Sequence, residues 1–515
     1  MKRAIAVVAF TLLIFFLQGP RSALAPGLPA AAGEDAAAKT ARTAARVSTS
    51  SPLSAFDLKR RIDGIFGASG LRKVLFSARI VDADTGNSVY EKNPHLAIMP
   101  ASNMKIVTSA AALEYLGRDF SFVTRVGLCG DALVIRGSGD PLLGDKETDA
   151  KNGRRAYPFI PDITSRLREL EVVSVSDILI DTSIFDDQRV HPSWPLDQLH
   201  QKYACEVSGL NYNGNCIDIA AFNRNGKAVL TLDPPTDYVK LINALSIWRS
   251  RQSWFSVHRT HVPSELLIQG NCRTQAGPYA VAVENPALFF GRLLRDALAE
   301  AGIKVSGEVR ESPLPDGCKF RPVTEHSTSI GACLERTNKD SFGLAAEAMF
   351  KRLAVQSAPD ANQGSWEGGQ RVLSGYLQGI RVDETEFVIA DGSGLSRDNR
   401  LSANALTRVL MHLAAGADWE FYKGSLAVGG FDGTIENHFW EKKYRGRVFA
   451  KSGYIQAVRA LSGVICTDSG DYIFSILANK AGSGARSAID SAVKAVIDWA
   501  NSGPSSVPVN SLPKS

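Results

Sequence analysis

The sequence lacks several patterns that commonly mark a metal or nucleic-acid site. Its seven cysteines form no Cys-x-x-Cys pair, and its eight histidines show no His-x-His or His-x-x-x-His spacing, so no metal site is predicted. The formal net charge is only +5 over 515 residues and no run of Lys or Arg stands out, which argues against a nucleic-acid interface. No organic cofactor is expected.

Long apolar runs are also absent after the first 17 residues, so no membrane span is expected in the rest of the chain. The N-terminus has Lys2 and Arg3, an apolar run over residues 4–17 and the small-residue sequence Ala23-Leu24-Ala25. This order is typical of a secretory signal peptide, predicted here over 1–25, with an uncleaved anchor as the alternative. We therefore expect the mature protein to be periplasmic or otherwise extracytoplasmic.

Two segments have little periodicity and are rich in small residues and proline. They cover residues 26–54 and 502–515, and both are expected to be disordered. Export would permit disulfides, and Cys205 and Cys216 are the cysteines closest to each other in sequence. Because they flank a turn-like stretch at 211–215, a bridge between them is predicted. The odd number of cysteines leaves at least one thiol unpaired within the chain.

The folded region changes character along the chain. Residues 75–81 and 88–90 have a strand pattern around a turn, and residues 102–116 have helical apolar periodicity that ends at Gly117. From residue 122 to about 310 short strand-like runs dominate. Helix and strand patterns return together in the last third.

This order predicts an α/β (α+β) protein with one interrupted domain. The interrupted domain comprises residues 55–126 and 313–501, in which an antiparallel sheet is flanked by helices. The interruption is a β-rich insertion over 127–312.

Ser102 and Lys105 form a candidate catalytic pair at the start of the predicted helix. Side chains three residues apart share a helix face, so Lys105 can reach the Ser102 hydroxyl and act as its base when neutral. Backbone N–H groups at a helix start can also hold an oxyanion. The same spacing recurs at Ser491 and Lys494, but these residues lie opposite the apolar stripe of a C-terminal helix and are interpreted as solvated surface.

Lys451-Ser452-Gly453 ends a strand-like run and is the second candidate. A strand edge can pair with an extended peptide, the lysine can attract a terminal carboxylate, and the hydroxyl can hydrogen-bond to it. The glycine permits close backbone approach. A turn with a solvated lysine is the alternative for this motif taken alone.

Together these motifs resemble penicillin-binding DD-peptidases, in particular the penicillin-binding protein 4, or DacB-type, D-alanyl-D-alanine carboxypeptidases/endopeptidases. The resemblance spans roughly residues 76–499 in the family's order. The matching segments are Pro100-Ala101-Ser102-Asn103-Met104-Lys105, Gly137-Ser138-Gly139-Asp140-Pro141, Ile180-Asp181-Thr182-Ser183-Ile184-Phe185, Asn338-Lys339-Asp340-Ser341, Ala346-Glu347, Asp391-Gly392-Ser393-Gly394-Leu395-Ser396-Arg397, Gly433-Thr434 and Ala450-Lys451-Ser452-Gly453.

The resemblance implies a serine DD-peptidase/β-lactamase-like fold and an acyl-enzyme on Ser102. Lys105 is then the general base and Ser341 relays the proton to the leaving amine. The substrate carboxylate is held by Lys451 and Ser452, and the oxyanion by the N–H groups of Ser102 and Tyr454. The implied partners are peptidoglycan stem peptides, with β-lactam antibiotics as covalent inhibitors.

The resemblance further implies a pocket for a charged side chain of the stem peptide. Asp181 from the insertion and Arg397 from the catalytic domain would line this pocket, and Gln456 would join them. A diamino-acid side chain carries an ammonium and a carboxylate, which an Asp and an Arg would suit. The alternative is that Asp181 caps a turn and that Arg397 pairs at the surface.

One departure from the family pattern affects the expected activity. The Ser-x-Asn motif is replaced by Ser341-Phe342-Gly343, whereas a Ser-x-Asn at Ser402-Ala403-Asn404 is interpreted as a helix cap. Losing one buried hydrogen bond costs about 1–3 kcal/mol, so slow catalysis is favoured over none. The alternatives are an inactive wall-binding protein of this fold, or a β-lactamase-like or esterase-like hydrolase.

Overall fold

The protein is described by a computed structural model at residues 55–248, 250–357 and 363–502. The predicted signal peptide (1–25), the predicted linker (26–54) and the predicted tail beyond residue 502 lie outside the described residues. Within the described residues, no helix combines the length and apolar character needed to cross a membrane.

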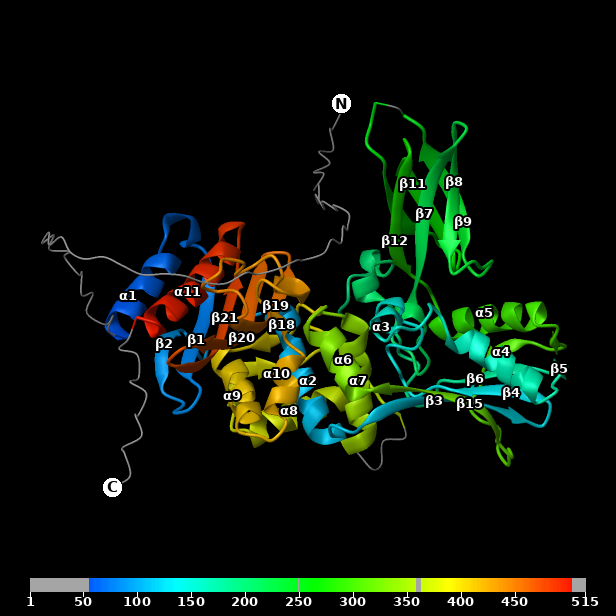
Figure 1. Cartoon of the computed structure of the whole chain (residues 1–515), viewed down its shortest axis with the longest axis horizontal. Helices are drawn as coiled ribbons and strands as arrows, with labels where there is room; N and C mark the ends of the chain where they lie inside the picture. Colours follow the sequence, from blue (N-terminus) through cyan, green and yellow to red (C-terminus); the bar gives the residue numbers. More distant parts are fainter. Residues whose placement is uncertain (1–54, 249, 358–362, 503–515) are drawn as a thin grey trace, which may run out of the picture. The chain divides into compact units, whose positions relative to one another are not determined.

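A six-stranded antiparallel sheet forms the centre of the interrupted domain (Figure 1). In spatial order its strands are β18 (Ala427–Val428), β19 (Val448–Ile455), β20 (Val458–Thr467), β21 (Gly470–Asn479), β1 (Leu75–Asp82) and β2 (Ser88–Lys92). β1 pairs with β21 along its whole length, with Phe76 opposite Ala478, so the two ends of the chain share one sheet. The predicted strands at 75–81 and 88–90 are confirmed.

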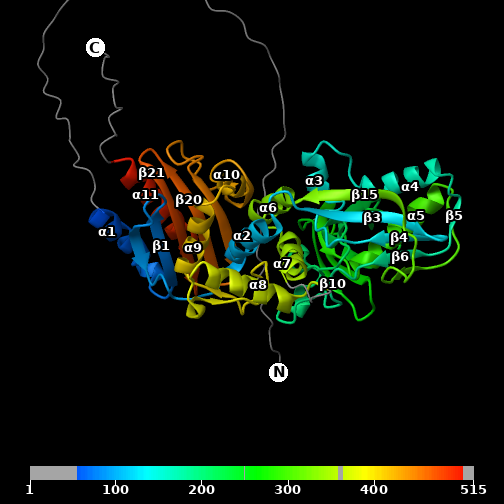
Figure 2. The ribbon, with the colours of Figure 1, turned by 90° about the horizontal axis from the view of Figure 1, so that it is seen from below.

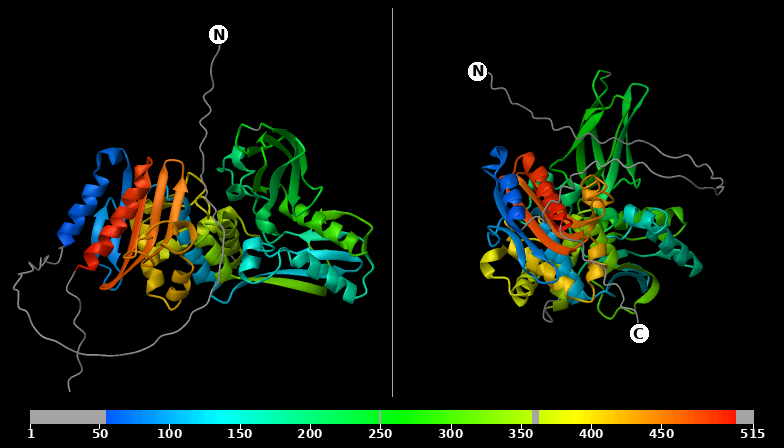
Figure 3. Two further views of the ribbon diagram at one scale, coloured as in Figure 1. Left: turned by 45° about the horizontal axis from the view of Figure 1, so that its top comes forward. Right: turned by 60° about the vertical axis from the view of Figure 1, so that its left-hand side comes forward.

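Strand β21 shows why helices cover both faces of this sheet. Side chains alternate along a strand, and Phe474 and Ile476 join one buried cluster whereas Ile473 and Leu477 join another. The first cluster packs under α1 (Ala55–Phe66) and α11 (Gly484–Ala500). Figure 3 shows these two terminal helices side by side in both views.

The other face of the sheet carries the helices that build the active site, as the view from below shows (Figure 2). They are α2 (Met104–Leu116), α6 (Ile330–Asn338), α7 (Gly343–Ser357), α8 (Trp366–Gly379), α9 (Ala403–Ala414) and α10 (Trp419–Gly424). A short ladder of β16 (Phe387–Val388) and β17 (Arg400–Leu401) lies between α8 and α9 in sequence. α2 ends at Gly117 with φ +86°, which confirms the predicted end of this helix.

The insertion has its own sheet and its own core. The five strands are, in order, β14 (Val309–Glu311), β6 (Ile178–Asp181), β4 (Ala132–Arg136), β3 (Ser121–Cys129) and β15 (Arg321–Ser329). Helices α4 (Phe159–Glu169) and α5 (Pro286–Glu300) pack on it. Because β3 and β15 belong to this sheet, it extends beyond the predicted bounds of the insertion at both ends.

The remaining elements of the insertion are mostly strands. Two three-stranded sheets have the orders β10-β11-β9 and β12-β7-β8, and β13 pairs with β5. Their bounds, with that of helix α3, are β5 (Ser174–Val175), β7 (Cys216–Arg224), β8 (Lys227–Asp233), β9 (Lys240–Ser246), β10 (Trp254–Arg259), β11 (Glu265–Asn271), β12 (Gln275–Ala282), β13 (Lys304–Val305) and α3 (Lys146–Lys151). The β-rich character predicted for this region is thus observed.

The predicted bridge between Cys205 and Cys216 is wrong. Both are buried free thiols, and the disulfide joins Cys129 to Cys318 across 189 residues. The reason is tertiary: Cys129 ends β3 and Cys318 lies just before β15, and these strands are antiparallel neighbours. Proximity in sequence therefore gave the wrong partner.

Candidate active site

Ser102 lies in a tight turn that leads directly into helix α2. Residues Ala101–Asn103 form a 3-10 turn, and Ala101 before the serine has the unusual φ of +47°. This turn leaves Ser102 partly exposed while the start of α2 behind it is buried. The Nζ atom of Lys105 lies 3.2 Å from the Ser102 Oγ, so the predicted pair is in hydrogen-bonding contact.

Lys105 is held in a buried environment that favours its neutral form. Burial lowers the pKa of its ammonium to about 8, although the negative charges of Glu347 and Asp391 act in the opposite direction. The Nζ also donates to the carbonyl oxygen of Ser393 at 2.6 Å, which fixes its position. A lysine with such a pKa can accept a proton near neutral pH.

The loop at residues 391–397 supplies that carbonyl, and several hydrogen bonds to its backbone hold it in place. The Asp391 carboxylate accepts from the backbone N–H groups of Gly394 and Ser396, and Glu347 accepts from the N–H of Ser393 at 2.7 Å. Burial, followed by the charge of Asp391, raises the pKa of Glu347 to about 7. Gly394 has φ +80°, and a Cβ there would lie 1.9 Å from the Ala101 carbonyl oxygen, so only glycine lets the loop approach the nucleophile turn.

Ser341 and Lys451 form a second serine–lysine contact beside the first. The Lys451 Nζ donates to the Ser341 Oγ at 2.9 Å and to the Ser452 carbonyl oxygen at 2.7 Å. Burial, and then the nearby charge of Lys105, lower the pKa of Lys451 well below its usual value. Ser341 has φ +58° immediately before α7, and its hydroxyl contacts a lysine whose lowered pKa favours giving up a proton.

Strand β19 presents an open edge next to this site. β18 pairs only with Phe449 and Ala450 on this side, so among the described residues Lys451 to Ile455 have no strand partner there. The Ser452 Oγ donates to the Thr434 Oγ1 at 2.7 Å. An exposed strand edge with hydroxyls at its start can receive an extended peptide and its carboxylate.

Gly453 brings this strand against the nucleophile turn. A Cβ at Gly453 would lie 3.0 Å from the Pro100 carbonyl oxygen and 3.2 Å from the Asn103 Nδ2. The Asn103 Nδ2 donates to the Lys451 carbonyl oxygen at 2.9 Å and so ties the two elements together. These contacts would be tight, so the glycine favours the close approach that its position in the motif suggested.

A cavity of about 510 Å³ opens over these groups. Its lining comprises Ser102, Lys105, Ser193, Pro195, Gln198, Tyr203, Ser341, Gly343, Ser393, Gly394, Leu395, Arg397, Tyr454, Ile455 and Gln456. A serine hydroxyl next to a lysine of lowered pKa, beside an unpaired strand edge in one cavity, is equipped for nucleophilic acyl transfer. No cluster of His, Cys, Asp or Glu suited to a metal ion occurs in the described part of the chain.

Comparison with known proteins identifies the family. The family model described as D-Ala-D-Ala carboxypeptidase 3 (S13) matches residues 59–498. The chain belongs to this family. The predicted relationship to penicillin-binding D-alanyl-D-alanine carboxypeptidases is therefore confirmed.

Individual relatives agree with this assignment. The "D-alanyl-D-alanine carboxypeptidase" of Actinomadura sp. (strain R39) is 29% identical over 451 residues, which are 82% of this chain and 81% of that protein. The "Carboxypeptidase DacB" of Mycolicibacterium smegmatis is 26% identical over 430 residues, 81% of this chain and 79% of that protein. The crystal structure of penicillin binding protein 4 (dacB) from Haemophilus influenzae superposes with a TM-score of 0.71 at 18% identity, over 85% of this chain and 98% of that one. The predicted fold class is confirmed.

Within this S13 chain, the structure separates Asp181 from the other predicted site residues. Arg397 and Gln456 line the cavity, and an Arg397 guanidinium nitrogen donates to the Gln456 carbonyl oxygen at 3.1 Å. Asp181 ends β6 in the insertion sheet, where it accepts from the Ser183 hydroxyl and N–H and lies 3.6 Å from Arg136. Asp181 is therefore bonded within a turn and is not among the residues that line this cavity, so a substrate pocket shared by Asp181 and Arg397 stays a prediction.

The insertion contributes different residues, which the sequence interpretation missed. Ser193, Pro195, Gln198 and Tyr203 line the cavity, and the Ser193 Oγ donates to the Ser396 Oγ at 2.6 Å. The neighbouring Trp194 donates its indole N–H to Asp391 at 2.8 Å. The sequence signal for this segment is weak, namely a tryptophan before proline in a stretch without strand or helix periodicity.

Proposed function

We propose that this S13 chain hydrolyses the D-alanyl-D-alanine bond of peptidoglycan stem peptides through an acyl-enzyme on Ser102. The observation that carries the proposal is the 3.2 Å contact between the Ser102 Oγ and a buried Lys105 whose pKa is lowered to about 8. Proton transfer to such a base makes an otherwise weak serine nucleophilic. The enzyme is a serine-type carboxypeptidase, as its family relationship implies.

The acylation step uses the two serine–lysine contacts in turn. Neutral Lys105 takes the hydroxyl proton while the Ser102 Oγ attacks the carbonyl carbon of the penultimate D-alanine. The resulting oxyanion accepts hydrogen bonds from the N–H groups of Ser102 and Tyr454. Ser341 gives its proton to the leaving amine and regains one from the lysines, the C–N bond breaks, and D-alanine departs. Water then hydrolyses the ester and regenerates the Ser102 hydroxyl.

The substrate is oriented by strand β19 and its neighbours. An extended peptide pairs with the open edge beyond Lys451, and its terminal carboxylate lies against Ser452, Thr434 and the Lys451 ammonium. The negative charge of that carboxylate raises the pKa of Lys451 and so favours its positively charged form on binding. Arg397 and Gln456 contact the side chain of the stem peptide at the far end of the cavity.

Because the chain has Gly343 in place of the family's Asn, this position has no side-chain amide to bind the substrate carbonyl. Gly343 lines the cavity where that side chain would begin, and Gln198 of the insertion lines the same cavity. The Gln198 Oε1 accepts a hydrogen bond from the Tyr203 hydroxyl at 2.8 Å, which restrains the side chain. We assign Gln198 the task of donating to the substrate carbonyl, in place of the absent Asn.

We extend the proposal to acylation of Ser102 by penicillins and to an extracytoplasmic location of the enzyme. A β-lactam carries an amide carbonyl and a carboxylate at a spacing close to that of the peptide, so it acylates Ser102 and is released slowly. A wall substrate requires an extracytoplasmic enzyme, which agrees with the signal-like sequence at residues 1–25.

Labelling with a fluorescent penicillin, beside D-alanine release from a diacetylated L-Lys-D-Ala-D-Ala peptide, tests the proposal. Wild type should show both activities, and Ser102→Ala should show neither while unfolding at the same temperature. A folded wild type with no label and no release would instead support a non-catalytic wall-binding protein. Rapid penicillin turnover without peptide cleavage would indicate a β-lactamase-like hydrolase.

A further inference from the structure

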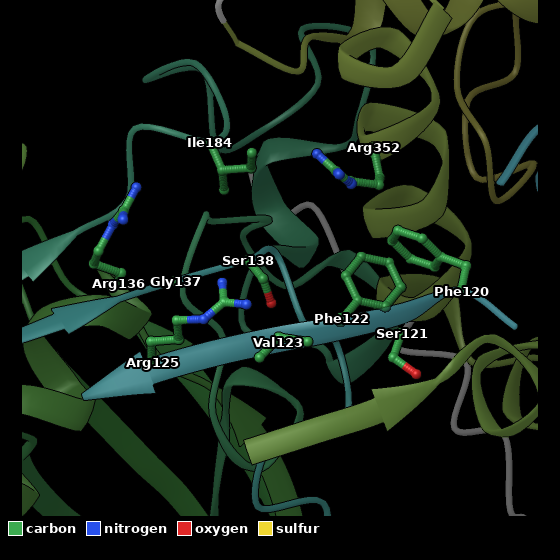
Figure 4. A pocket seen from close by; sticks show the side chains of 10 residues that line it. All are labelled: Phe120, Ser121, Phe122, Val123, Arg125, Arg136, Gly137, Ser138, Ile184 and Arg352. Atoms are coloured by element: carbon green, nitrogen blue, oxygen red, sulfur yellow. The ribbon is translucent and has the colours of Figure 1, made fainter. Parts of the chain in front are cut away.

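A second cavity, of about 300 Å³, lies at the junction between the insertion and the helices of the catalytic domain. Figure 4 shows its lining, which comprises Phe120, Ser121, Phe122, Val123, Arg125, Arg136, Gly137, Ser138, Ile184 and Arg352. The lining includes three arginines and no Asp or Glu. None of these residues lines the active-site cavity.

The arginines come from three different elements. Arg125 lies on β3 and Arg136 on the neighbouring β4, whereas Arg352 lies on α7 across the cavity (Figure 4). Arg125 is 3.5 Å from Glu325 and Arg136 is 3.6 Å from Asp181, and both arginines are about half exposed. Both pairs are long and the Arg125–Glu325 pair is exposed on both sides, so the two pairs neutralise the site only in part.

Arg352 carries a charge that no carboxylate of residues 55–248, 250–357 or 363–502 balances. Among the described residues it forms no ion pair, and its guanidinium lies 5.5 Å from the centre of the Phe120 ring. Burial lowers the pKa of this guanidinium. An arginine that is partly buried without an anionic partner is a costly arrangement, which a bound anion would relieve.

Ser138 adds an independent polar group to the same cavity. Its Oγ is shielded from solvent and has no hydrogen-bond partner among the described residues. Buried hydroxyls are nearly always hydrogen-bonded, because an unsatisfied one costs about 1–3 kcal/mol. Ser138 is thus available to donate to an oxygen atom of a ligand.

We propose that this cavity binds a phosphate or carboxylate group carried on an organic molecule. The guanidinium groups match the oxygens of such anions in a bidentate geometry, which also explains the use of Arg rather than Lys. Phe120, Phe122 and Ile184 contact the carbon atoms of that molecule. The absence of acidic lining residues argues against a cationic ligand.

The proposed anion site also connects the catalytic domain to the insertion. Arg352 lies nine residues beyond Gly343 on α7, so the anion site is about 14 Å along this helix from the active-site cavity. An anion held by Arg352 and Arg125 together links a catalytic-domain helix to an insertion strand. Binding should therefore raise the unfolding temperature of the full chain as the ligand concentration rises.

The test is calorimetric titration of the full chain with three probes: glycerol 3-phosphate, citrate and a poly(glycerol phosphate). Glycerol, which is uncharged, serves as the negative probe. Saturable binding of at least one anionic probe, absent for glycerol, is expected. Tighter binding of the polymer than of glycerol 3-phosphate would identify a wall phosphodiester as the source, whereas tighter binding of the small anions would identify a free metabolite.

Variants locate the binding. Arg352→Gln should weaken binding about tenfold or more, and Arg352→Lys should restore part of it, because Lys keeps the charge without the bidentate geometry. Arg125→Gln, on the partly exposed strand, provides a second variant should Arg352→Gln fold poorly. The matched control is Arg371→Gln, which removes an exposed arginine paired with Glu367 on α8 and should leave binding unchanged.

Arg397→Gln distinguishes this cavity from the active site, because Arg397 is the arginine that lines the catalytic cavity. Binding that is lost in Arg397→Gln but retained in Arg352→Gln and Arg125→Gln would overturn the proposal. So would equal losses in Arg352→Gln and the Arg371→Gln control, or a failure of all three anionic probes to bind. None of these outcomes depends on peptidase activity.

Discussion

Within the described residues, the Ser-x-x-Lys spacing occurs at the start of α2 and again within α11, and the two regions differ in every property that matters for catalysis. Lys105 is 3% exposed and contacts Ser102, whereas Ser491 is exposed and Lys494 pairs with Glu441 at 2.5 Å. Spacing places both serines one helical turn from a lysine. Only burial, which favours the neutral amine, turns one of these lysines into a base.

The position of each serine reinforces the difference. Ser102 precedes α2 in a turn in which Ala101 has φ +47°, so its own N–H lies at a helix start, where such groups can bind an oxyanion. Ser491 is in the middle of α11, where the backbone hydrogen bonds of the helix are complete. Substitutions in α11 and around Ser102 test this difference.

The largest expected effect is that of removing the nucleophile. Ser102→Ala should lower D-alanine release by at least about 10⁴-fold, because no covalent intermediate can form. Ser491→Ala, the matched control, should leave the rate unchanged. Mass spectrometry after penicillin treatment checks the assignment of Ser102 as the nucleophile. An adduct on the peptide that carries Ser491 would contradict it.

Substitution of Lys105 should slow acylation far more than substitution of Lys494, a difference almost as large as that between the two serines. Lys105→Met should reduce acylation by roughly 10²- to 10⁴-fold, the usual contribution of a general base. Lys494→Met removes only a partly exposed ion pair and should change stability by less than about 1 kcal/mol. Stopped-flow acylation and thermal unfolding measure the two effects, and equal rate losses in both variants would refute the assigned base.

The pH dependence follows from the lowered pKa of Lys105. Only its neutral form accepts the proton, so the acylation rate should rise by roughly 50-fold between pH 6 and pH 8 and level off above about 8. Glu347 raises the pKa of Lys105, so Glu347→Gln should move the midpoint to lower pH. A midpoint that stays in place in Glu347→Gln would show that this carboxylate does not influence the base.

A smaller effect is expected at Gly343, where the chain departs from the family motif. A Cβ there would meet only the Tyr203 carbonyl oxygen at 3.4 Å and the Ser393 Cβ at 3.9 Å, and Gly343 does not have a positive φ. The backbone and the space around the Cβ therefore permit a side chain here, and Gly343→Asn should speed acylation about tenfold by adding one hydrogen bond of about 1–3 kcal/mol.

Gly343→Asn in a Gln198→Ala background tests whether Gln198 replaces the missing Asn amide or whether no side chain replaces it. If Gln198 supplies the missing amide, Gln198→Ala should slow acylation, and the additional Gly343→Asn change should restore it. Acylation rates of the two single variants and the double variant decide the matter. A Gln198→Ala variant as fast as wild type would remove Gln198 from the site.

Local patterns in the sequence were sufficient for the catalytic motifs and for much of the secondary structure. The helix that follows Ser102, the β1–β2 hairpin and the cap at Ser402 depend on apolar periodicity and turn chemistry within a dozen residues. Because the motifs occur in the family's order, their combination also identified the family. These features are local, so the sequence determined them by itself.

Contacts between distant segments were decided only by the tertiary structure. The disulfide partner of Cys129 depends on the pairing of β3 with β15, and the cavity wall at Ser193 depends on how the insertion returns to the loop at 391–397. The environment of Asp181 depends on tertiary structure for the same reason, since it is set by a sheet whose strands are far apart in the chain. The pKa of Lys105 likewise depends first on burial, which lowers it, and then on the charges of Glu347 and Asp391, which raise it and lie more than 200 residues away in sequence.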